Sequence, residues 1–538
     1  MHFTSLQFLL FAALTLLFYF VMPKSRQWWV LLAASYVFYL FAGPEFFPFL
    51  LYTTAVTYLT ARILQRMADA EDDYVAQNRD ILEKSARKAY RAAAKKRRFW
   101  VLICGLLLGF GLLAVLKYTG FVLSSIRSVV VALGGGSFSV PSLLLPLGIS
   151  FYTFQSMGYL IDVYRKKVHA ELNPAKLALF VSFFPQIIQG PISRFDSLAS
   201  ELFAPHSFSG MAFRSGLCRI TWGFFKKMVV ADTAMLGVRE LARVVPQGEI
   251  GTAPEFNGVY VLILILLYSV QIYGDFTGGI DITLGVSEMM GIRIAENFNR
   301  PFSSRSTKEY WRRWHITMGT WFTDYIFYPL SVCLPMQRLS KWSRAKLGES
   351  LGKRIPVYLA TIATWFLTGL WHGAGWNFIV WGLLNCAVIL VSQELQPLYN
   401  RFNKRLPRLV ASKPWEKWQM VRTFLLMGLI RSLDVYRDVP RSFAKWASML
   451  TVWNWNELWS GGLTSFGLSL PDLLLLGASV LLMWAVSRMG AGGTPLRQKI
   501  AARPVLFCAC ICAASVVILL FGAYGIGYDA SQFIYNQF

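Results

Sequence analysis

The sequence has few charged residues, and this shortage excludes an ordinary soluble protein. Asp, Glu, Lys and Arg make up only 15% of the 538 residues, whereas 55% are hydrophobic. A soluble protein carries roughly 25% charged residues. The apolar residues form long runs, and a run of about 20 residues crosses a bilayer as a helix. Because a β-barrel would instead have short alternating strands, the sequence predicts an all-α polytopic membrane protein.

Acidic residues are especially scarce. The chain has 29 Asp and Glu against 53 Lys and Arg, which gives a net charge of +24. In a soluble protein this excess would suggest nucleic-acid binding. Here the basic residues lie in the connections between apolar runs, as the positive-inside rule describes for cytoplasmic loops. We therefore expect the lipid bilayer, and not nucleic acid, as the partner of this surface.

Two further shortages narrow the class of protein. The seven cysteines do not suggest a disulfide framework, and no histidine or carboxylate lies near Cys508, Cys510 and Cys512 to complete a metal site. We expect no metal. No Lys or Arg precedes the first apolar run, 3–22, whereas a signal peptide carries its positive charge in front. We therefore expect a retained first span with an extracytoplasmic N-terminus.

The apolar runs predict a bundle of about 11–13 transmembrane helices, with re-entrant and interfacial helices, in a single domain over 1–538. The insertion 65–99 is basic, rich in Ala and free of Pro, which favours a cytoplasmic surface helix. Arg431 and the basic residues after it fall on the nominally external side, so they line a polar cavity or their segment does not fully cross. The C-terminus is expected outside. The main expected spans are 3–22, 28–43, 47–64, 100–117, 142–163, 258–274, 355–371, 376–394, 419–434, 470–488 and 504–523.

Three segments interrupt the apolar pattern with polar residues, glycine or proline. Broken backbone at membrane depth is tolerated only inside protein or beside a water-filled cavity, so we expect 183–194 to line a cavity. The segment 222–227 predicts a short span or re-entrant piece. Its two lysines, Lys226 and Lys227, suit interface anchoring, with a phosphate contact as the alternative. The segment 271–281, with two acids and three glycines, predicts a helix break with structural or catalytic acids.

The stretch 306–377 is the predicted catalytic core, because it holds two of the five histidines. Ionisable side chains inside a membrane are costly, so they are functional candidates. Ser306 and Glu309 have capping-box spacing, which predicts a helix from Thr307. One face of that helix would carry Trp311, His315, Met318 and Phe322. An interfacial helix with a hydrogen-bonded histidine and a functional site are equally good interpretations of His315 alone.

The second histidine, His372, lies between the apolar segments 355–371 and 376–394. Both segments have basic outer flanks, which predicts a hairpin with both ends in the cytoplasm. His372 is then in the turn, among glycines that allow a backbone or a ligand to approach closely. A straight helix of 17 residues rises about 26 Å, so His372 would lie well across the membrane, or nearer its middle if the hairpin tilts. A functional role is favoured over a structural one.

Five motifs, in order, resemble the membrane-bound O-acyltransferases. They are QGPISR (189–194), YGDF (273–276), NRPF (299–302), WRRWH (311–315) and GLWHG (369–373). The likeness is greatest to the bacterial branch that includes the alginate O-acetyltransferase membrane subunit, and the C-terminal residues 528–538 are similar to that branch too. The resemblance covers most of the chain. It implies that His372 is the essential catalytic histidine and His315 the second family position.

The resemblance also implies substrates and partners. The acyl donor would be cytoplasmic, with acetyl-CoA as donor substrate and not as a bound cofactor, and the acceptor would be an exported polysaccharide reached from outside. Members of this branch usually work with an extracytoplasmic SGNH-type acetyltransferase. Related proteins transfer D-alanine to teichoic acid from an acylated carrier protein, which is the alternative. The expected location is the bacterial cytoplasmic membrane.

The chemistry of acyl transfer fits these residues. Transfer from a thioester requires a base for the attacking hydroxyl, and histidine titrates near neutral pH. We therefore expect His372 to be the base, while His315 orients a substrate or stabilises the oxyanion. A proton-coupled transporter or polysaccharide exporter is the main rival, because intramembrane His, Asp and Arg with broken helices also suit transport. A scaffold subunit for a catalytic partner is a third hypothesis.

Overall fold

The computed structural model describes residues 3–243, 256–490 and 494–524. Within these ranges the chain is helical, and its only β pairing is a single bridge between Phe298 and Trp314. The C-terminal stretch 528–538, which contributed to the family resemblance, lies outside the described residues. The prediction of an all-α protein is confirmed.

Contacts within the chain define two compact units, which we describe separately. The first unit comprises Met1–Phe213 with Val286–Ala295, and the second comprises Arg214–Gly285 with Glu296–Phe538. The helices of the first unit are α1 Leu6–Val21, α2 Gln27–Leu40, α3 Phe47–Gln77, α4 Lys84–Ala132, α5 Ile149–Tyr164, α6 Pro174–Ser182 and α7 Phe195–Leu202.

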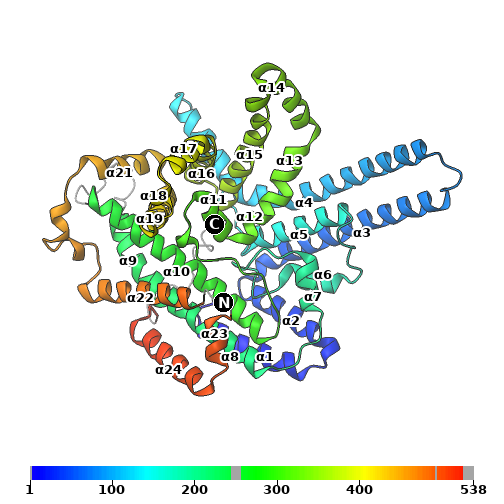
Figure 1. The fold of residues 1–538 in the computed structure, drawn as a ribbon. Coiled ribbons are helices and arrows are strands. Elements are labelled where there is room, and N and C mark those ends of the chain that lie inside the picture. Colours follow the sequence, from blue (N-terminus) through cyan, green and yellow to red (C-terminus); the bar gives the residue numbers. More distant parts are fainter. Residues whose placement is uncertain (1–2, 244–255, 491–493, 525–538) are drawn as a thin grey trace. The chain divides into compact units, whose positions relative to one another are not determined.

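The insertion 65–99 is a helical hairpin and not one surface helix, which corrects the sequence prediction. Its first part continues α3 and its second part begins α4, so the two helices run side by side (Figure 1). Glu71 and Arg98 form an ion pair of 2.9 Å between the two helices, with both side chains only 6% exposed. One acid near the start of the insertion therefore pairs with a basic residue near its end, across the hairpin. With 49 residues, α4 is about 74 Å long, more than twice the thickness of a bilayer core.

The segment 183–194 is non-helical and buried, as its prolines and glycine predict. A chain of side-chain hydrogen bonds holds it against the buried helix α5. Gln186 Nε2 donates to Gln155 Oε1 at 2.9 Å, and Ser193 Oγ donates to Gln186 Oε1 at 3.1 Å. Polar groups in a buried loop require such partners. The broken backbone is confirmed, whereas its role in lining a cavity stays a prediction.

Most of the helices belong to the second unit. In chain order they are α8 Gly210–Phe224, α9 Asp232–Leu241, α10 Val259–Met289, α11 Thr307–Arg313, α12 Ile316–Phe322, α13 Tyr328–Val332, α14 Leu334–Gly352, α15 Arg354–His372, α16 Trp376–Glu394, α17 Gln396–Arg405, α18 Pro407–Val410, α19 Lys413–Arg431, α20 Leu433–Tyr436, α21 Val439–Thr451, α22 Leu470–Met489, α23 Leu496–Ala501 and α24 Pro504–Phe521.

Helix α10 is continuous, so the predicted break at 271–281 is wrong. Its glycines serve close helix packing instead. A Cβ on Gly278 would lie 2.8 Å from the carbonyl oxygen of Gly223, and a Cβ on Gly223 would lie 2.6 Å from that of Gly278. Small residues let helix backbones approach this closely. Glycine in an apolar run therefore marked a contact between α8 and α10, and not a break.

The segment 222–227 is part of a longer helical stretch, because α8 continues through a π-helical segment, Phe225–Ala231, into α9. Lys226 and Lys227 are buried, so the prediction that they anchor the chain at the interface is wrong. Lys226 Nζ is 2.6 Å from Asp281, and Lys227 Nζ is 2.7 Å from both Asp275 and Asp232. Buried charges must be paired. The two acids of the 271–281 segment supply these pairs.

Six helical segments in the described residues are long and apolar enough to cross a membrane, judged by length and composition. They are Pro44–Gln77, Lys84–Ala132, Val259–Met289, Trp376–Glu394, Leu470–Met489 and Pro504–Phe521, and α1 is a shorter apolar helix. These segments confirm a multi-pass membrane protein. The larger number of about 11–13 spans stays a prediction.

Candidate active site

His315 lies at a break between two short helices. The hydroxyl of Ser306 accepts a hydrogen bond from the Glu309 amide at 3.2 Å, so the predicted helix start at Thr307 is confirmed. The continuous helix predicted as far as Phe322 is wrong, because His315 has a left-handed backbone with φ of 48°. The segment 297–299 runs alongside the break and pairs with it through backbone hydrogen bonds. Backbone hydrogen bonds with the segment 297–299 thus replace helical hydrogen bonds around His315.

Asn297 determines which nitrogen of His315 carries the proton. Its Oδ1 accepts hydrogen bonds from the Thr317 amide at 3.1 Å and the Thr317 hydroxyl at 3.0 Å. The amide nitrogen of Asn297 then faces His315 Nδ1 at 3.1 Å. Oδ1 is also 3.3 Å from Nδ1, but it is already used by Thr317. An amide NH₂ only donates, so with the amide in this orientation Nδ1 accepts and the ring proton is assigned to Nε2.

The surroundings of His315 keep it neutral. The ring is fully buried, and burial lowers its pKa from 6.5 to about 3, with the positive charge of Arg431 acting in the same direction. The Arg431 guanidinium lies 4.0 Å from the ring centre of Trp314 and donates to the Tyr310 hydroxyl at 2.8 Å. The arginine that fell on the nominally external side of the predicted topology is therefore packed inside the protein, beside the histidine site.

His372 is the last residue of α15, and α16 begins at Trp376, so the predicted hairpin with His372 at its turn is confirmed. The two helices touch through glycine. A Cβ on Gly369 would overlap the carbonyl oxygen of Phe378, and one on Gly382 would overlap that of Trp365. His372 itself is half-buried, with its ring 4.6 Å from the ring of Trp381. As a whole residue it is thus less buried than His315, although the Nε2 atoms of both histidines are buried.

Trp371 connects the two histidines. Its ring is 5.6 Å from the ring of His315 and 4.9 Å from that of His372, measured between centroids. Trp381 packs on His372 and also contacts Trp311, whose indole nitrogen donates to Asn385 at 3.2 Å. The structure therefore brings both predicted site residues to one tryptophan, in an aromatic cluster built from α11, α15 and α16.

Comparison with known protein families and relatives identifies the family. Residues 166–343 match the sequence profile described as MBOAT, membrane-bound O-acyltransferase family. The chain is 32% identical to the probable alginate O-acetylase AlgI of Pseudomonas aeruginosa over 479 residues, which are 88% of this chain and 80% of that protein. The chain belongs to the membrane-bound O-acyltransferase family.

Further relatives of this membrane-bound O-acyltransferase support the same assignment. The probable alginate O-acetylase AlgI of Azotobacter vinelandii is 32% identical over 397 residues, 74% of this chain and 69% of that protein. The peptidoglycan O-acetyltransferase of Helicobacter pylori is 29% identical over 416 residues, 72% of this chain and 68% of that protein. The chain is therefore an O-acyltransferase, and the family resemblance read from the five motifs is confirmed.

Sequence reasoning missed three residues around the histidines of this O-acyltransferase. Asn297 gave no signal, because a single Asn before the NRPF motif has no periodicity or spacing of its own. Trp371 was visible only as a neighbour of His372 in the chain, and its contact with His315 is tertiary. Arg431 did give a signal, since its charge disagreed with the predicted topology. A basic residue that contradicts the positive-inside rule is therefore a candidate for a buried site.

Proposed function

We propose that this O-acyltransferase moves an acetyl group from cytoplasmic acetyl-CoA across the membrane, for O-acetylation of an exported polysaccharide such as alginate or another cell-surface glycan. The support for acetyl is that relatives named alginate O-acetylase and peptidoglycan O-acetyltransferase align with most of the chain. The basic connections support an anionic donor on the cytoplasmic side, because a positive surface raises the local concentration of such a molecule.

The observation that carries the proposal is the difference between two histidines on one tryptophan. His372 lies at a helix end beside a glycine turn, and its side chain is less buried than that of His315, although its Nε2 atom is buried. It takes the proton of the attacking hydroxyl as the oxygen bonds to the thioester carbonyl carbon, and the carbon–sulfur bond then breaks. The proton passes to the coenzyme A thiolate, which leaves an acetyl ester and a thiol. A positioned base contributes about 10²- to 10⁴-fold to such a step.

His315 has the complementary role in this proposal. Its neutral ring carries the proton on Nε2, so it donates a hydrogen bond and does not act as a base. A donor aimed at the carbonyl oxygen stabilises the negative charge that develops there. The hydrogen bond of Asn297 and the burial of the ring support this assignment, since both favour the neutral Nε2–H form.

We further propose an extracytoplasmic partner of the SGNH acetyltransferase type, which would place the acetyl group on the polysaccharide. The two-protein arrangement follows from the bacterial branch that the motifs resemble. It leaves the membrane-bound O-acyltransferase with the step that begins at the cytoplasmic donor. The enzyme would then lie in the bacterial cytoplasmic membrane.

The test is the acetyl ester content of exported and cell-wall glycans in three strains: wild type, His372→Ala and a gene deletion. We expect His372→Ala to match the deletion, and the glycan that loses acetate identifies the acceptor. Membrane abundance of the variant must equal that of wild type. Unchanged ester in all three strains would contradict the proposal for those glycans. Full ester content in His372→Ala, with loss only in the deletion, would make the chain a scaffold for its partner.

A further inference from the structure

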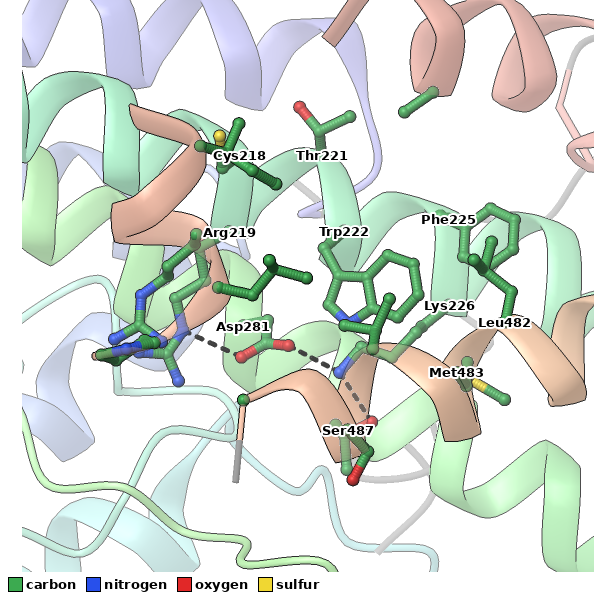
Figure 2. A pocket seen from close by; sticks show the side chains of 18 of the residues that line it. Cys218, Arg219, Thr221, Trp222, Phe225, Lys226, Asp281, Leu482, Met483 and Ser487 are labelled. Atoms are coloured by element: carbon green, nitrogen blue, oxygen red, sulfur yellow. Dashed lines mark hydrogen bonds and ion pairs between the residues drawn. The ribbon is translucent and has the colours of Figure 1, made fainter. Parts of the chain in front are cut away.

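The second unit contains a cavity of about 720 Å³ whose lining has two chemically different parts (Figure 2). Helix α8, the π-helical segment and α10 supply charged and polar side chains, and α22 and α24 supply apolar ones. The volume falls within the roughly 300–1,000 Å³ of ordinary small-molecule sites. The two histidines are not among the lining residues, so this is a second candidate site.

The apolar part of the lining belongs to helices that can face the bilayer. Leu482 and Val486 come from the last turns of α22, and Ile511, Ala514 and Val517 come from α24. Both helices are candidate membrane spans, and no residue of α24 is buried within the chain. A molecule that fills this side of the cavity must therefore be apolar and can come from the membrane.

The polar part of the lining carries more positive than negative charge. Arg219 bonds to Asp281 at 2.8 Å and to both carboxylate oxygens of Glu296, and Lys226 bonds to Asp281 at 2.6 Å (Figure 2). These two carboxylates balance Arg219 and Lys226. Arg497 and Arg300 also line the cavity, and Arg497 is only 3.7 Å from the already engaged Glu296.

Arg300 supplies charge that no carboxylate among the described residues neutralises. Within the described residues its side chain forms no ion pair, and it lies in a left-handed backbone position beside Phe298 and Asn299, which also line the cavity. A cation with no carboxylate partner next to an apolar wall suits an anionic group joined to an acyl chain. Guanidinium groups bind phosphate oxygens with two parallel hydrogen bonds.

We propose that the cavity holds one anionic phospholipid from the bilayer, with its phosphate at Arg300 and Arg497 and one acyl chain against α22 and α24. An acetyl donor does not explain the apolar wall, because a two-carbon acyl group has no chain to cover it. The lipid also supports the candidate active site mechanically. Phe298 packs against Trp314 at 5.0 Å and against Phe276 at 4.8 Å, and Phe276 contacts His315.

The test measures the phospholipid that remains with the purified full-length protein, by native mass spectrometry and by extraction. Ala514→Phe fills the cavity from α24, and Ala509→Phe makes the same change at an exposed residue of the same helix outside the lining. We expect Ala514→Phe to lose most of the retained lipid and Ala509→Phe to keep it. Equal lipid in the two variants, each eluting as a folded protein, would overturn the proposal.

A second variant tests the head group without altering the apolar wall. Arg300→Gln should keep a bound lipid but lose preference for phosphatidylglycerol over phosphatidylcholine by roughly fivefold, the effect of one basic side chain near an anionic lipid. An unchanged preference for phosphatidylglycerol would show that the lipid phosphate does not bind at Arg300. Acetyl-CoA is then added as competitor: we expect no displacement of phosphatidylglycerol, and displacement would reassign the cavity to the acyl donor. None of these readouts depends on which glycan is acetylated.

Discussion

The two histidines of this O-acyltransferase touch the same tryptophan, yet their surroundings are opposite. His315 is fully buried, held by Asn297 in a left-handed break between helices, and its pKa is lowered to about 3 by burial. His372 ends a regular helix at a glycine turn and is only half-buried. This contrast is the basis for proposing a fixed hydrogen-bond donor at His315 and a proton acceptor at His372, because the role of a histidine depends on its burial and partners.

The largest effect should come from the less buried histidine, His372. Replacing His372 with Ala removes the proposed base, so acetyl transfer in membrane vesicles should fall by about 10²- to 10⁴-fold. The measurement is the rate of acetyl ester formation from labelled acetyl-CoA at equal membrane abundance. His169→Ala is the matched control, because His169 is an exposed histidine in the first unit and its loss should leave the rate unchanged. A rate for His372→Ala within twofold of the wild-type rate would show that His372 is not the general base.

The next effect should come from the buried histidine, and its size should depend on the replacement. His315→Ala removes the proposed donor, and loss of one such donor costs about 10² to 10³ in rate. His315→Gln keeps a side-chain N–H and should retain more activity than His315→Ala. The same vesicle assay measures both. Equal losses in the two variants, with equal folding by thermal melting, would show that the ring has a packing role and not a donor role.

A smaller effect should follow from changing the partner of His315. Asn297→Asp preserves size but replaces the NH₂ donor with a carboxylate acceptor, so the ring proton would move to Nδ1. The rate should fall by roughly 10- to 100-fold, the scale for losing the group that orients a functional histidine. The pH profile should also change, since a carboxylate raises the pKa of its histidine partner. Asn400→Asp, at an exposed position on α17, should alter neither quantity.

The smallest effect concerns stability in acid. Because the pKa of His315 is lowered in the folded protein from its ordinary 6.5, unfolding takes up a proton at mildly acidic pH. The stability from this group is complete above pH 6.5 and is lost as the pH falls toward 3. The melting temperature of wild type should therefore fall on acidification from pH 7 to pH 5, and that of His315→Gln should fall less. Parallel declines would show that His315 is not kept neutral by the fold.

Sequence patterns predicted the structure correctly where the contacts that determine it are local. The α15–α16 hairpin was predicted from two apolar runs with basic flanks. The position of His372 at the turn was predicted from the glycines between the two runs. The helix start at Thr307 followed from the spacing of Ser306 and Glu309. In each case the determining contacts lie within a few residues along the chain.

Patterns failed where a distant segment decides the conformation. The periodicity around His315 predicted one helix, but Asn297 and Asn299 pair with the backbone there and break it. Glycines in α10 predicted a break, but a second helix packs against them and the helix continues. The sequence around Lys226 and Lys227 predicted anchoring at the membrane interface, but both lysines are buried and paired with carboxylates on α10. Tertiary partners of this kind have no signature in the spacing of one sequence.

The π-helical segment between α8 and α9 gives the chain a tolerance for one extra residue. Successive residues of an α-helix are rotated by about 100°, so one extra residue in a regular helix would change the direction of every later side chain. A π-helical turn takes up such a residue locally, and the buried face of α9, with Ala234, Val238 and Leu241, keeps its direction. A homologue that is one residue shorter within Phe225–Ala231 could therefore have a regular helix here with α8 and α9 in the same register.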